Sequence, residues 1–357
     1  MSKGPESLVR DEVRALRAYH VAPAQGMVKL DAMENPYALP PALAAQMGER
    51  LARVAVNRYP DPTAPGLRAR LRKVMRIPGE LEVLLGNGSD EVLQIVAMAM
   101  ARPGAVALAP EPSFAMYRLS AIACGLRYEG VALRPDFSLD LPAMLRALEE
   151  RRPAVTWIAY PNNPTGNLFP REAILRLVQA SPGLVVVDEA YHAFSGDATL
   201  LDEVGRHPNL LLVRTVSKLG LAGLRLGLAI GARGWIAELE KLRLPYNVNA
   251  LSMAAAELLL DHFDVLESQT RAIVAERARL EAALDRLAGV ARFPSAANFV
   301  LARVPDAPRA FERLRQRGIL VRNFHGSHPL LEHCLRLTVG TPGENDRLVE
   351  ALLPAIA

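Results

Sequence analysis

The 357-residue sequence is poor in cysteine, with Cys124 and Cys334 as its only two. Two cysteines are too few for a disulfide framework, and both lie in apolar surroundings, so we expect buried thiols in a reducing compartment. The apolar stretch 92–101 is too short to span a membrane, and residues 1–17 lack the apolar centre of a signal peptide. The sequence therefore predicts a cytoplasmic protein without a membrane partner.

Charge of one sign is not concentrated anywhere in the chain. There are 42 Lys and Arg against 38 Asp and Glu, for a net charge of +4, and the two signs are interspersed. Because no basic arm or stripe stands out, a nucleic-acid partner is not favoured. We also expect no metal site.

Short apolar runs alternate with helical segments through the first two thirds of the chain. The expected strands are 83–85, 105–109, 155–160, 184–187, 210–215 and 226–230, and the helices among them are 90–101, 114–124, 141–150 and 171–179. This alternation predicts an α/β fold with a mostly parallel mixed sheet covered on both faces.

The chain is long for one compact core, so we expect more than one domain. The predicted division is an N-terminal arm (1–30), a large domain (31–250) and a smaller C-terminal α+β domain (251–357). Helices are expected at 5–17, 40–54 and 67–75, and residues 250–287 form two long helices or one helix broken near 261–264. The remaining expected elements are strands 298–304, 319–322 and 335–339 and helices 309–317 and 344–353.

Lysine is scarce among the basic residues, and one of the five lysines has an unusual position. Lys218 follows the apolar run 210–213 and precedes a loop with Gly220 and Gly223, after which comes Arg225. An ammonium in apolar surroundings loses hydration and holds its proton weakly, so its amine can attack a carbonyl. Taken alone, Lys218 also fits a structural side chain that reaches solvent at a strand end.

Polar residues end two neighbouring expected strands. Asp188 follows four aliphatic residues, where an unmatched buried charge is costly, so it is a helix cap, a partner of a protein cation or a partner of a pyridinium nitrogen. Asn163 lies in a turn with two prolines and a glycine that fix its backbone, although such turns are common. Tyr191 either points toward the same place as Asp188 or only packs.

Residues 86–91 follow an expected strand and open a helix. Free amides there, with the hydroxyl of Ser89, form an anion site, although similar turns also only cap helices. The segment matches neither the phosphate-loop pattern nor the dinucleotide glycine pattern. Phe114 follows the next strand and either stacks on a flat ring or fills the core.

In this order the motifs resemble those of the fold-type-I enzymes that use pyridoxal 5′-phosphate (PLP), specifically the aminotransferases, over essentially the whole chain. The resemblance implies that Lys218 binds the cofactor aldehyde covalently and that Asp188 keeps the pyridine nitrogen protonated, so that the ring acts as an electron sink. The other implied cofactor contacts are Asn163 and Tyr191 at the phenolic oxygen, Phe114 on the ring face, and Gly88, Ser89, Ser217 and Arg225 at the phosphate, with Asp90 in the same loop. Tyr59 corresponds to a tyrosine that reaches the phosphate from the neighbouring subunit, which implies a homodimer with shared active sites.

A closer resemblance is to the histidinol-phosphate aminotransferases, through Tyr19 in the arm and the segments 34–37, 57–60, 321–324 and 334–341. It implies transfer of an amino group between glutamate and imidazole acetol phosphate in histidine biosynthesis. Arg322 and Arg336 would bind the substrate phosphate with help from Tyr19, and Asn35 would be a further substrate residue. Met33, Ala38 and Phe114 depart from residues common in that family, which leaves substrate detail open.

Three alternatives remain open at this point. An aromatic-amino-acid aminotransferase would need one arginine for a carboxylate, and a threonine-phosphate decarboxylase has the same set of cofactor residues. A PLP-sensing regulator is the non-enzymatic alternative. Such regulators carry a DNA-binding domain before this fold, whereas here we expect only the arm.

Overall fold

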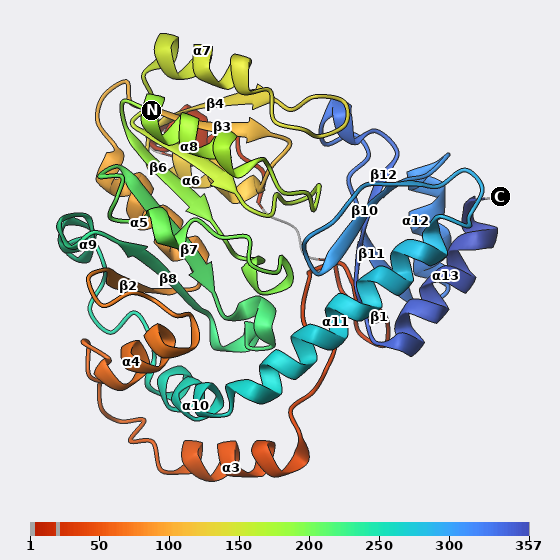
Figure 1. Ribbon diagram of the computed structural model, residues 1–357, viewed down its shortest axis with the longest axis horizontal. Coiled ribbons are helices and arrows are strands. Elements are labelled where there is room, and N and C mark those ends of the chain that lie inside the picture. The colour runs from red at the N-terminus through yellow and green to blue at the C-terminus, as the bar shows by residue number, and fades with distance from the viewer. Residues whose placement is uncertain (1–3, 19–21, 357) are drawn as a thin grey trace.

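The computed structural model describes residues 4–18 and 22–356, and two sheets organise this part of the chain (Figure 1). The larger sheet has seven strands in the order β2-β8-β7-β6-β5-β3-β4. Four neighbouring pairs are parallel, whereas β8 is antiparallel to both β2 and β7. The expected mostly parallel mixed sheet is confirmed. Its strands are β2 (Glu82–Asn87), β3 (Val106–Glu111), β4 (Arg127–Ala132), β5 (Val155–Ala159), β6 (Leu184–Asp188), β7 (Leu210–Thr215) and β8 (Leu226–Gly231).

Helices cover both faces of this sheet because its central strands are apolar on both sides. In β6, Leu184 and Val186 pack into one hydrophobic cluster, whereas Val185 and Val187 pack into another. Alternate side chains of a strand point to opposite faces, so a strand buried in this way needs a helical layer on each. The helices that follow the strands are α5 (Ser89–Met100), α6 (Ala115–Ala123), α7 (Leu141–Arg151), α8 (Arg171–Ala180) and α9 (Arg233–Glu240).

The sequence patterns predict all strands of this sheet except β4. That strand lies at the edge of the sheet, and its side chains are partly or fully exposed. It contains Arg127, Glu129 and Gly130, so it has no continuous apolar run. An edge strand that buries little apolar surface gives only a weak hydrophobic signal.

The smaller sheet has five strands in the order β1-β11-β12-β10-β9. Figure 1 shows it beside the larger sheet with helices α12 and α13. The strands β9 and β1 do not stand out in the sequence because they have only two and three residues. The elements are β1 (Val28–Leu30), β9 (Ala291–Arg292), β10 (Phe299–Arg303), α12 (Ala307–Gln316), β11 (Ile319–Asn323), β12 (Cys334–Thr338) and α13 (Pro342–Ile356).

The N-terminal segment and the helices after residue 249 connect the two sheets. β1 pairs in parallel with β11, so the last residues of the expected arm belong to the smaller sheet. The predicted break near 261–264 occurs at His262, between α10 (Ala250–Asp261) and α11 (Phe263–Leu284). Because α10 packs against α3 (Pro41–Ala52) and α4 (Pro65–Val74), it lies with the larger sheet. The division at residues 30 and 250 stays a prediction.

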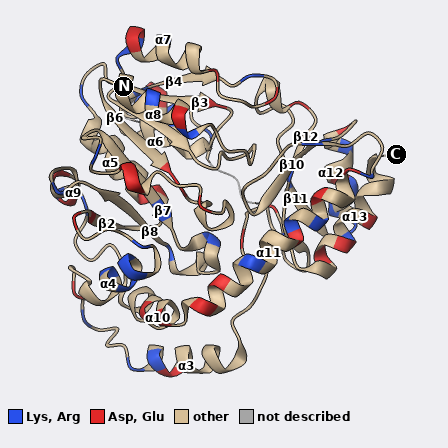
Figure 2. Cartoon of the chain, viewed as in Figure 1, with Lys and Arg blue, Asp and Glu red and all other residues tan. Residues whose placement is uncertain are grey.

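The described part of the arm forms two short helices, α1 (Pro5–Leu8) and α2 (Asp11–Arg14), instead of the one expected over 5–17. No helix within residues 4–18 and 22–356 is both long and apolar enough to cross a bilayer. Figure 2 shows basic and acidic residues mixed along α11 and α12. Short 3-10 helices lie at His192–Phe194 (η1), Leu201–Glu203 (η2), Ser217–Leu219 (η3), Ala222–Leu224 (η4) and Pro329–Leu331 (η5).

Candidate active site

A cavity lies at the carboxyl ends of β5, β6 and β7, where α5 also begins, as is typical of ligand sites in open α/β sheets. The space within it, together with adjoining open solvent, is about 540 Å³. Nine of the predicted cofactor residues line it: Ser89, Asp90, Phe114, Asn163, Asp188, Tyr191, Ser217, Lys218 and Arg225. Its other lining residues are Met33, Ala159, Pro161, Ala190 and Thr215.

Asp188 presents a buried carboxylate to this cavity. The hydroxyl of Tyr117 donates to Asp188 Oδ2 at 3.0 Å, and the N–H of Ala190 donates to Oδ1 at 3.1 Å. Burial raises the pKa of Asp188 to about 6, although both hydrogen bonds favour the charged form. In the described chain no cationic side chain donates to this carboxylate, so a cationic group of a ligand would satisfy it.

Lys218 reaches the same cavity from η3, directly after β7. Its Nζ donates to the carbonyl of Ala32 at 3.2 Å and lies 5.9 Å from the centre of the Tyr191 ring. Burial, together with the positive charge of Arg336, lowers the pKa of Lys218 to about 8. At that pKa about one tenth of the amine is neutral at pH 7, so Lys218 can act as a nucleophile and as a proton acceptor.

An anion site lies at the N-terminus of α5. Gly88 has φ +86°, and a Cβ there would come within 2.7 Å of Arg225 Nη2. Gly227 packs so closely on the start of α5 that a Cβ would come within 2.2 Å of the Ser89 nitrogen. These two glycines let the guanidinium of Arg225 and the amides of the first turn share one space, where Ser89 and Ser217 add hydroxyls.

Asn163 and Tyr191 join the two sheets at the cavity. Asn163 Nδ2 donates to the hydroxyl of Tyr191 at 3.1 Å. Arg336, in β12 of the smaller sheet, donates through Nη1 to Asn163 Oδ1 at 2.5 Å and through Nη2 to the carbonyl of Asp31 at 2.7 Å. The cavity therefore has a buried guanidinium at its border with the smaller sheet.

Comparison with known proteins agrees with this geometry. The family model described as aminotransferase class I and II matches residues 25–352. The chain belongs to this family. It is 54% identical over 347 residues to a histidinol-phosphate aminotransferase of Chromobacterium violaceum, covering 97% of each chain. A histidinol-phosphate aminotransferase 1 of Ralstonia nicotianae is 54% identical over 354 residues, covering 98% of this chain and 94% of the relative.

A solved aminotransferase structure carries the cofactor. The histidinol-phosphate aminotransferase of Sinorhizobium meliloti, in complex with pyridoxal-5′-phosphate, superposes with a TM-score of 0.87 at 26% identity and covers 98% of both chains. This chain is likewise a PLP-dependent aminotransferase of fold type I. The cavity residues fit the cofactor, because a buried carboxylate, a weakly basic lysine and an anion site suit a pyridinium nitrogen, an aldehyde and a phosphate.

Five predicted site residues of this aminotransferase do not line the cavity, namely Gly88 and Arg336, described above, and Tyr59, Asn35 and Arg322. Tyr59 is 81% exposed and stacks on Tyr246, with ring centres 4.4 Å apart. Asn35 Nδ2 donates to the carbonyl of Leu219 and to Gln269, so it supports the segment that follows Lys218. Arg322 lies on β11 directly opposite Arg336. Tyr19 lies outside the described residues, and the ligand-binding roles of all these residues stay predictions.

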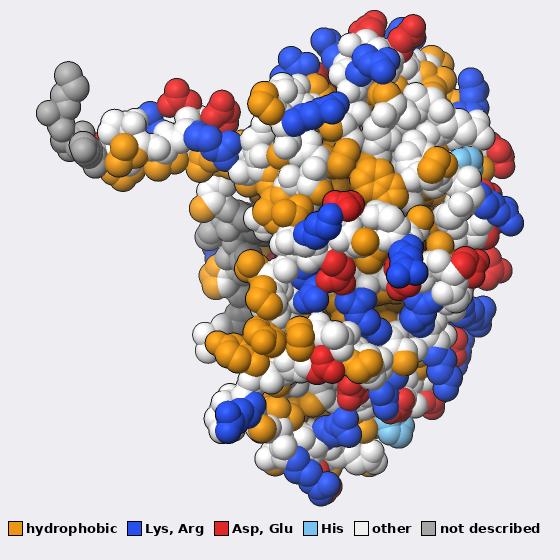
Figure 3. All heavy atoms as spheres, turned by 90° about the vertical axis from the view of Figure 1, so that its left-hand side faces the viewer, with side chains coloured by type: hydrophobic (Ala, Val, Ile, Leu, Met, Phe, Trp, Pro, Cys, Tyr) orange, Lys and Arg blue, Asp and Glu red, His pale blue; other side chains and the backbone are white. Residues whose placement is uncertain are grey.

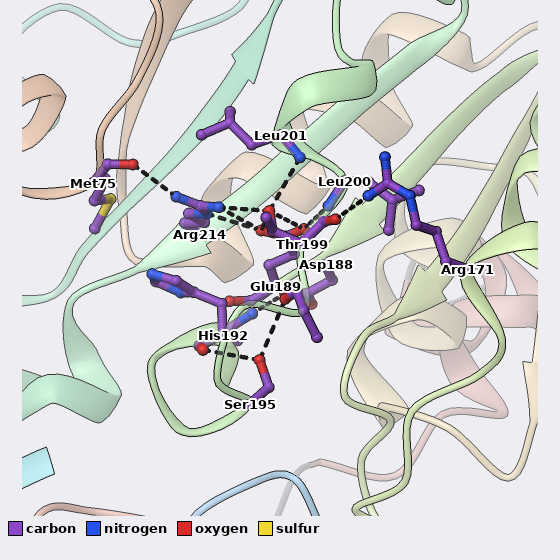
Figure 4. Close-up of polar contacts among 12 residues, drawn as sticks. Met75, Arg171, Asp188, Glu189, His192, Ser195, Thr199, Leu200, Leu201 and Arg214 are labelled. Carbon is purple, nitrogen blue, oxygen red and sulfur yellow. Dashed lines mark hydrogen bonds and ion pairs between the residues drawn. The ribbon is translucent and has the colours of Figure 1, made fainter. Parts of the chain in front are cut away.

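A second polar network surrounds Glu189, the residue next to Asp188 in the aminotransferase site (Figure 4). Alternation along the strand sends Glu189 away from Asp188, and Arg214 donates to Glu189 Oε2 through Nε at 2.9 Å and Nη2 at 2.7 Å. Thr199 and the N–H of Leu200 also donate to this carboxylate. The network fixes the backbone beside Asp188. Its sequence signals are the acid directly after Asp188 and the arginine inside an apolar strand.

Tyr117 is the main functional residue that the sequence patterns miss. It is fully buried in α6, three positions after Phe114, and stacks on Trp157 with ring centres 5.6 Å apart. The signal that would find it is its helical spacing, because residue 117 lies one turn after the residue that meets the cavity.

Proposed function

We propose that this aminotransferase transfers an amino group between glutamate and imidazole acetol phosphate, forming histidinol phosphate in histidine biosynthesis. The observation that carries the proposal is the pair Arg322 and Arg336. They lie directly opposite each other on β11 and β12, and their guanidinium carbons lie 6.0 and 5.3 Å from the centre of the Phe324 ring. Like charges directly opposite in a sheet repel, and a phosphate dianion beside them would offset that repulsion.

The protein's own groups have distinct roles in this reaction. When bound, PLP supplies the electron sink for the substrate Cα and carries the amino group. The carboxylate of Asp188 would keep a positive charge on the ring nitrogen, and Asn163 and Tyr191 would hydrogen-bond the phenolic oxygen of the cofactor. Lys218 Nζ would take the proton from the Cα of the amino donor in one half-reaction and would deliver a proton to the Cα of the product in the other. Its pKa of about 8 suits both directions of proton transfer near neutral pH.

We also propose that the enzyme is a homodimer with shared active sites, in the cytoplasm. Exposed hydrophobic residues support an interface. The side chains with 40% to 81% of their surface exposed include Val56, Tyr59, Leu244, Tyr246 and Leu251. Figure 3 shows the arm extending from the body, and Leu8 and Val9 on it are exposed. Apolar surface of this kind is typical of an interaction face. The two unpaired cysteines suit a reducing compartment.

The substrate is tested by single-turnover half-reactions of the holoenzyme, followed through the absorbance of the bound cofactor. The four amines are histidinol phosphate, histidinol, phenylalanine and phosphothreonine. We expect histidinol phosphate to react at least about 100-fold more specifically than histidinol, since each charge-assisted contact contributes about 1.5–3 kcal/mol. Arg322→Ala erases most of that preference, whereas Arg309→Ala, on the exposed side of α12, leaves it intact.

The other outcomes of these half-reactions each indicate a different activity. Equal reactivity of histidinol and its phosphate contradicts the phosphate site. A preference for phenylalanine indicates an aromatic-amino-acid aminotransferase, and release of carbon dioxide from phosphothreonine indicates a decarboxylase. Binding of PLP without turnover of any amine and keto acid indicates a regulator.

A further inference from the structure

The loop that joins β11 to β12 holds three potential metal ligands. His325, Glu332 and His333 each offer one ligand atom, and these atoms lie within 4.8 Å of one another. Within residues 4–18 and 22–356 this is the one group of three histidine, cysteine or acidic side chains found that close together. It is separate from the cofactor cavity, whose lining includes none of the three.

His325 faces two groups that make opposite demands on one nitrogen. The backbone N–H of His333 donates to His325 Nδ1 at 3.2 Å, which requires a lone pair on that nitrogen. Glu332 Oε2 lies 2.9 Å from the same Nδ1 and carries lone pairs of its own. Nδ1 has a single lone pair in the ring plane, so it either accepts from His333 or carries a proton toward Glu332. A cation held between Nδ1 and Oε2 would take the place of that proton.

His333 supplies the third group. Its Nδ1 is buried and has no hydrogen-bond partner, and its ring centre lies 4.6 Å from that of His325. A buried polar nitrogen without a partner calls for an explanation, and a place for a bound ion is one of the recognised ones. The residue also has φ +58°, a conformation that side chains rarely adopt without support from their surroundings.

Backbone contacts hold all three residues in place. Asn323 Oδ1 accepts from the N–H of His325 at 2.9 Å, and the carbonyl of His333 accepts from the N–H of Val304 at 2.9 Å. Arg303 Nε donates to the carbonyl of Glu332 at 3.2 Å. A metal site of high affinity needs this kind of support, because ligands that are already positioned lose little freedom on binding.

We propose that His325, Glu332 and His333 form a site for one divalent transition-metal ion. Two imidazoles and one carboxylate suit Zn²⁺, and also Co²⁺, Ni²⁺ or Fe²⁺, with water completing the coordination. Mg²⁺ and Ca²⁺ prefer oxygen ligands and fit poorly. No spacing typical of metal ligands marks these residues in the sequence, because two of them are neighbours and the third lies seven positions earlier.

The ion would join the two ends of the loop. His325 lies two residues after β11 ends, and His333 lies directly before β12 begins. Phe324, whose ring lies beside Arg322 and Arg336, is the residue next to His325. The metal would therefore act as a clamp that fixes the loop beside the two arginines, and this inference does not depend on the identity of the substrate.

The test is metal binding by the holoenzyme after dialysis against a chelator. We expect calorimetry with Zn²⁺ to give one ion per chain with micromolar or tighter affinity, and Co²⁺ to give the visible absorption of a low-coordinate site. His325→Ala, Glu332→Gln and His333→Ala each weaken Zn²⁺ binding at least tenfold. Zn²⁺ also raises the melting temperature of the unaltered protein but not that of His333→Ala.

The matched control is His328→Asn, in the same loop. His328 Nδ1 accepts from the N–H of Leu330, a bond that an asparagine oxygen can replace, and His328 is not part of the cluster. This variant should bind Zn²⁺ as the unaltered protein does.

Absence of a single Zn²⁺ site, or equal affinity in all four variants, overturns the proposal. Equal loss in His328→Asn also overturns it, because loop integrity rather than ligation would then explain the binding. Glu332 is exposed, so Glu332→Gln keeps the test valid if a histidine variant fails to fold.

Discussion

Tyr117 donates its hydroxyl proton to Asp188 Oδ2 at 3.0 Å, from a helix on the side of the sheet opposite to the Glu189 network. The bond stabilises the charged carboxylate, while burial stabilises the neutral form and raises the pKa of Asp188 to about 6. Tyr117 does not line the cavity, so any effect on a ligand there would pass through Asp188. The charge that we propose for the pyridine nitrogen site therefore depends on a residue outside the cavity lining.

Replacing Tyr117 with phenylalanine should weaken that charge. The pKa of Asp188 rises further without the hydrogen bond, so the acidic limb of the kcat profile moves to higher pH and PLP affinity falls roughly tenfold. The measurements are kcat against pH and a PLP titration of the apoenzyme. Trp157→Phe is the control, because it disturbs the same aromatic stack and keeps the hydroxyl. An acidic limb at the same pH in Tyr117→Phe would show that the bond is only structural.

Lys218→Ala should remove the covalent attachment of the cofactor and lower turnover at least about 1000-fold, because nucleophile and proton carrier are lost together. Borohydride reduction followed by peptide mapping should find the cofactor on Lys218 in the unaltered enzyme. Lys241→Ala is the control, because that ammonium is exposed and pairs with Glu238 on the surface of α9. Cofactor trapped on a different lysine contradicts the assignment.

The apoenzyme should lose stability as the pH rises from about 4 to 6, through Asp188. The pKa of this carboxyl is raised from 3.8 to about 6 in the folded protein, so the folded state keeps a proton that the unfolded chain has released. The resulting loss approaches about 3 kcal/mol and is constant above pH 6. Urea unfolding of the apoenzyme at several pH values measures it. The control is Asp188→Asn, because an asparagine cannot titrate. The difference in free energy of unfolding between the unaltered protein and this variant should change between pH 4 and 6. A difference that stays constant over this range contradicts a buried carboxylate with a raised pKa.

The sequence predicts most of the cofactor site because its residues follow apolar strands. Asp188 and Lys218 come directly after β6 and β7, and neighbouring parallel strands end at the same edge of a sheet. Strand periodicity and chain order therefore suffice to bring them together. The same reasoning finds Asn163 after β5.

The remaining contacts depend on packing between elements distant in sequence. Arg336 reaches Asn163 across 173 positions, and β1 pairs with β11 although almost 300 residues separate them. No local pattern encodes such distances. Tyr117 has the same limitation, since its apolar helix face looks like ordinary core until Asp188 is known to lie opposite its hydroxyl.

Tyr59 provides the test of the shared active site. It is 81% exposed and does not line the cavity, so we expect any role at the phosphate to involve a second subunit. Lys218→Ala and Tyr59→Ala proteins should each be nearly inactive. Mixed in equal amounts under conditions that exchange subunits, they should recover about one quarter of the unaltered activity, because half of the dimers are hybrids with one intact site each. The control is a mixture of Lys218→Ala with Asp188→Ala, which stays inactive because both residues belong to the same subunit's site. Full activity of a protein that sediments as a monomer contradicts the contribution of Tyr59 across the interface. So does a lack of recovered activity in the first mixture when subunits are shown to exchange.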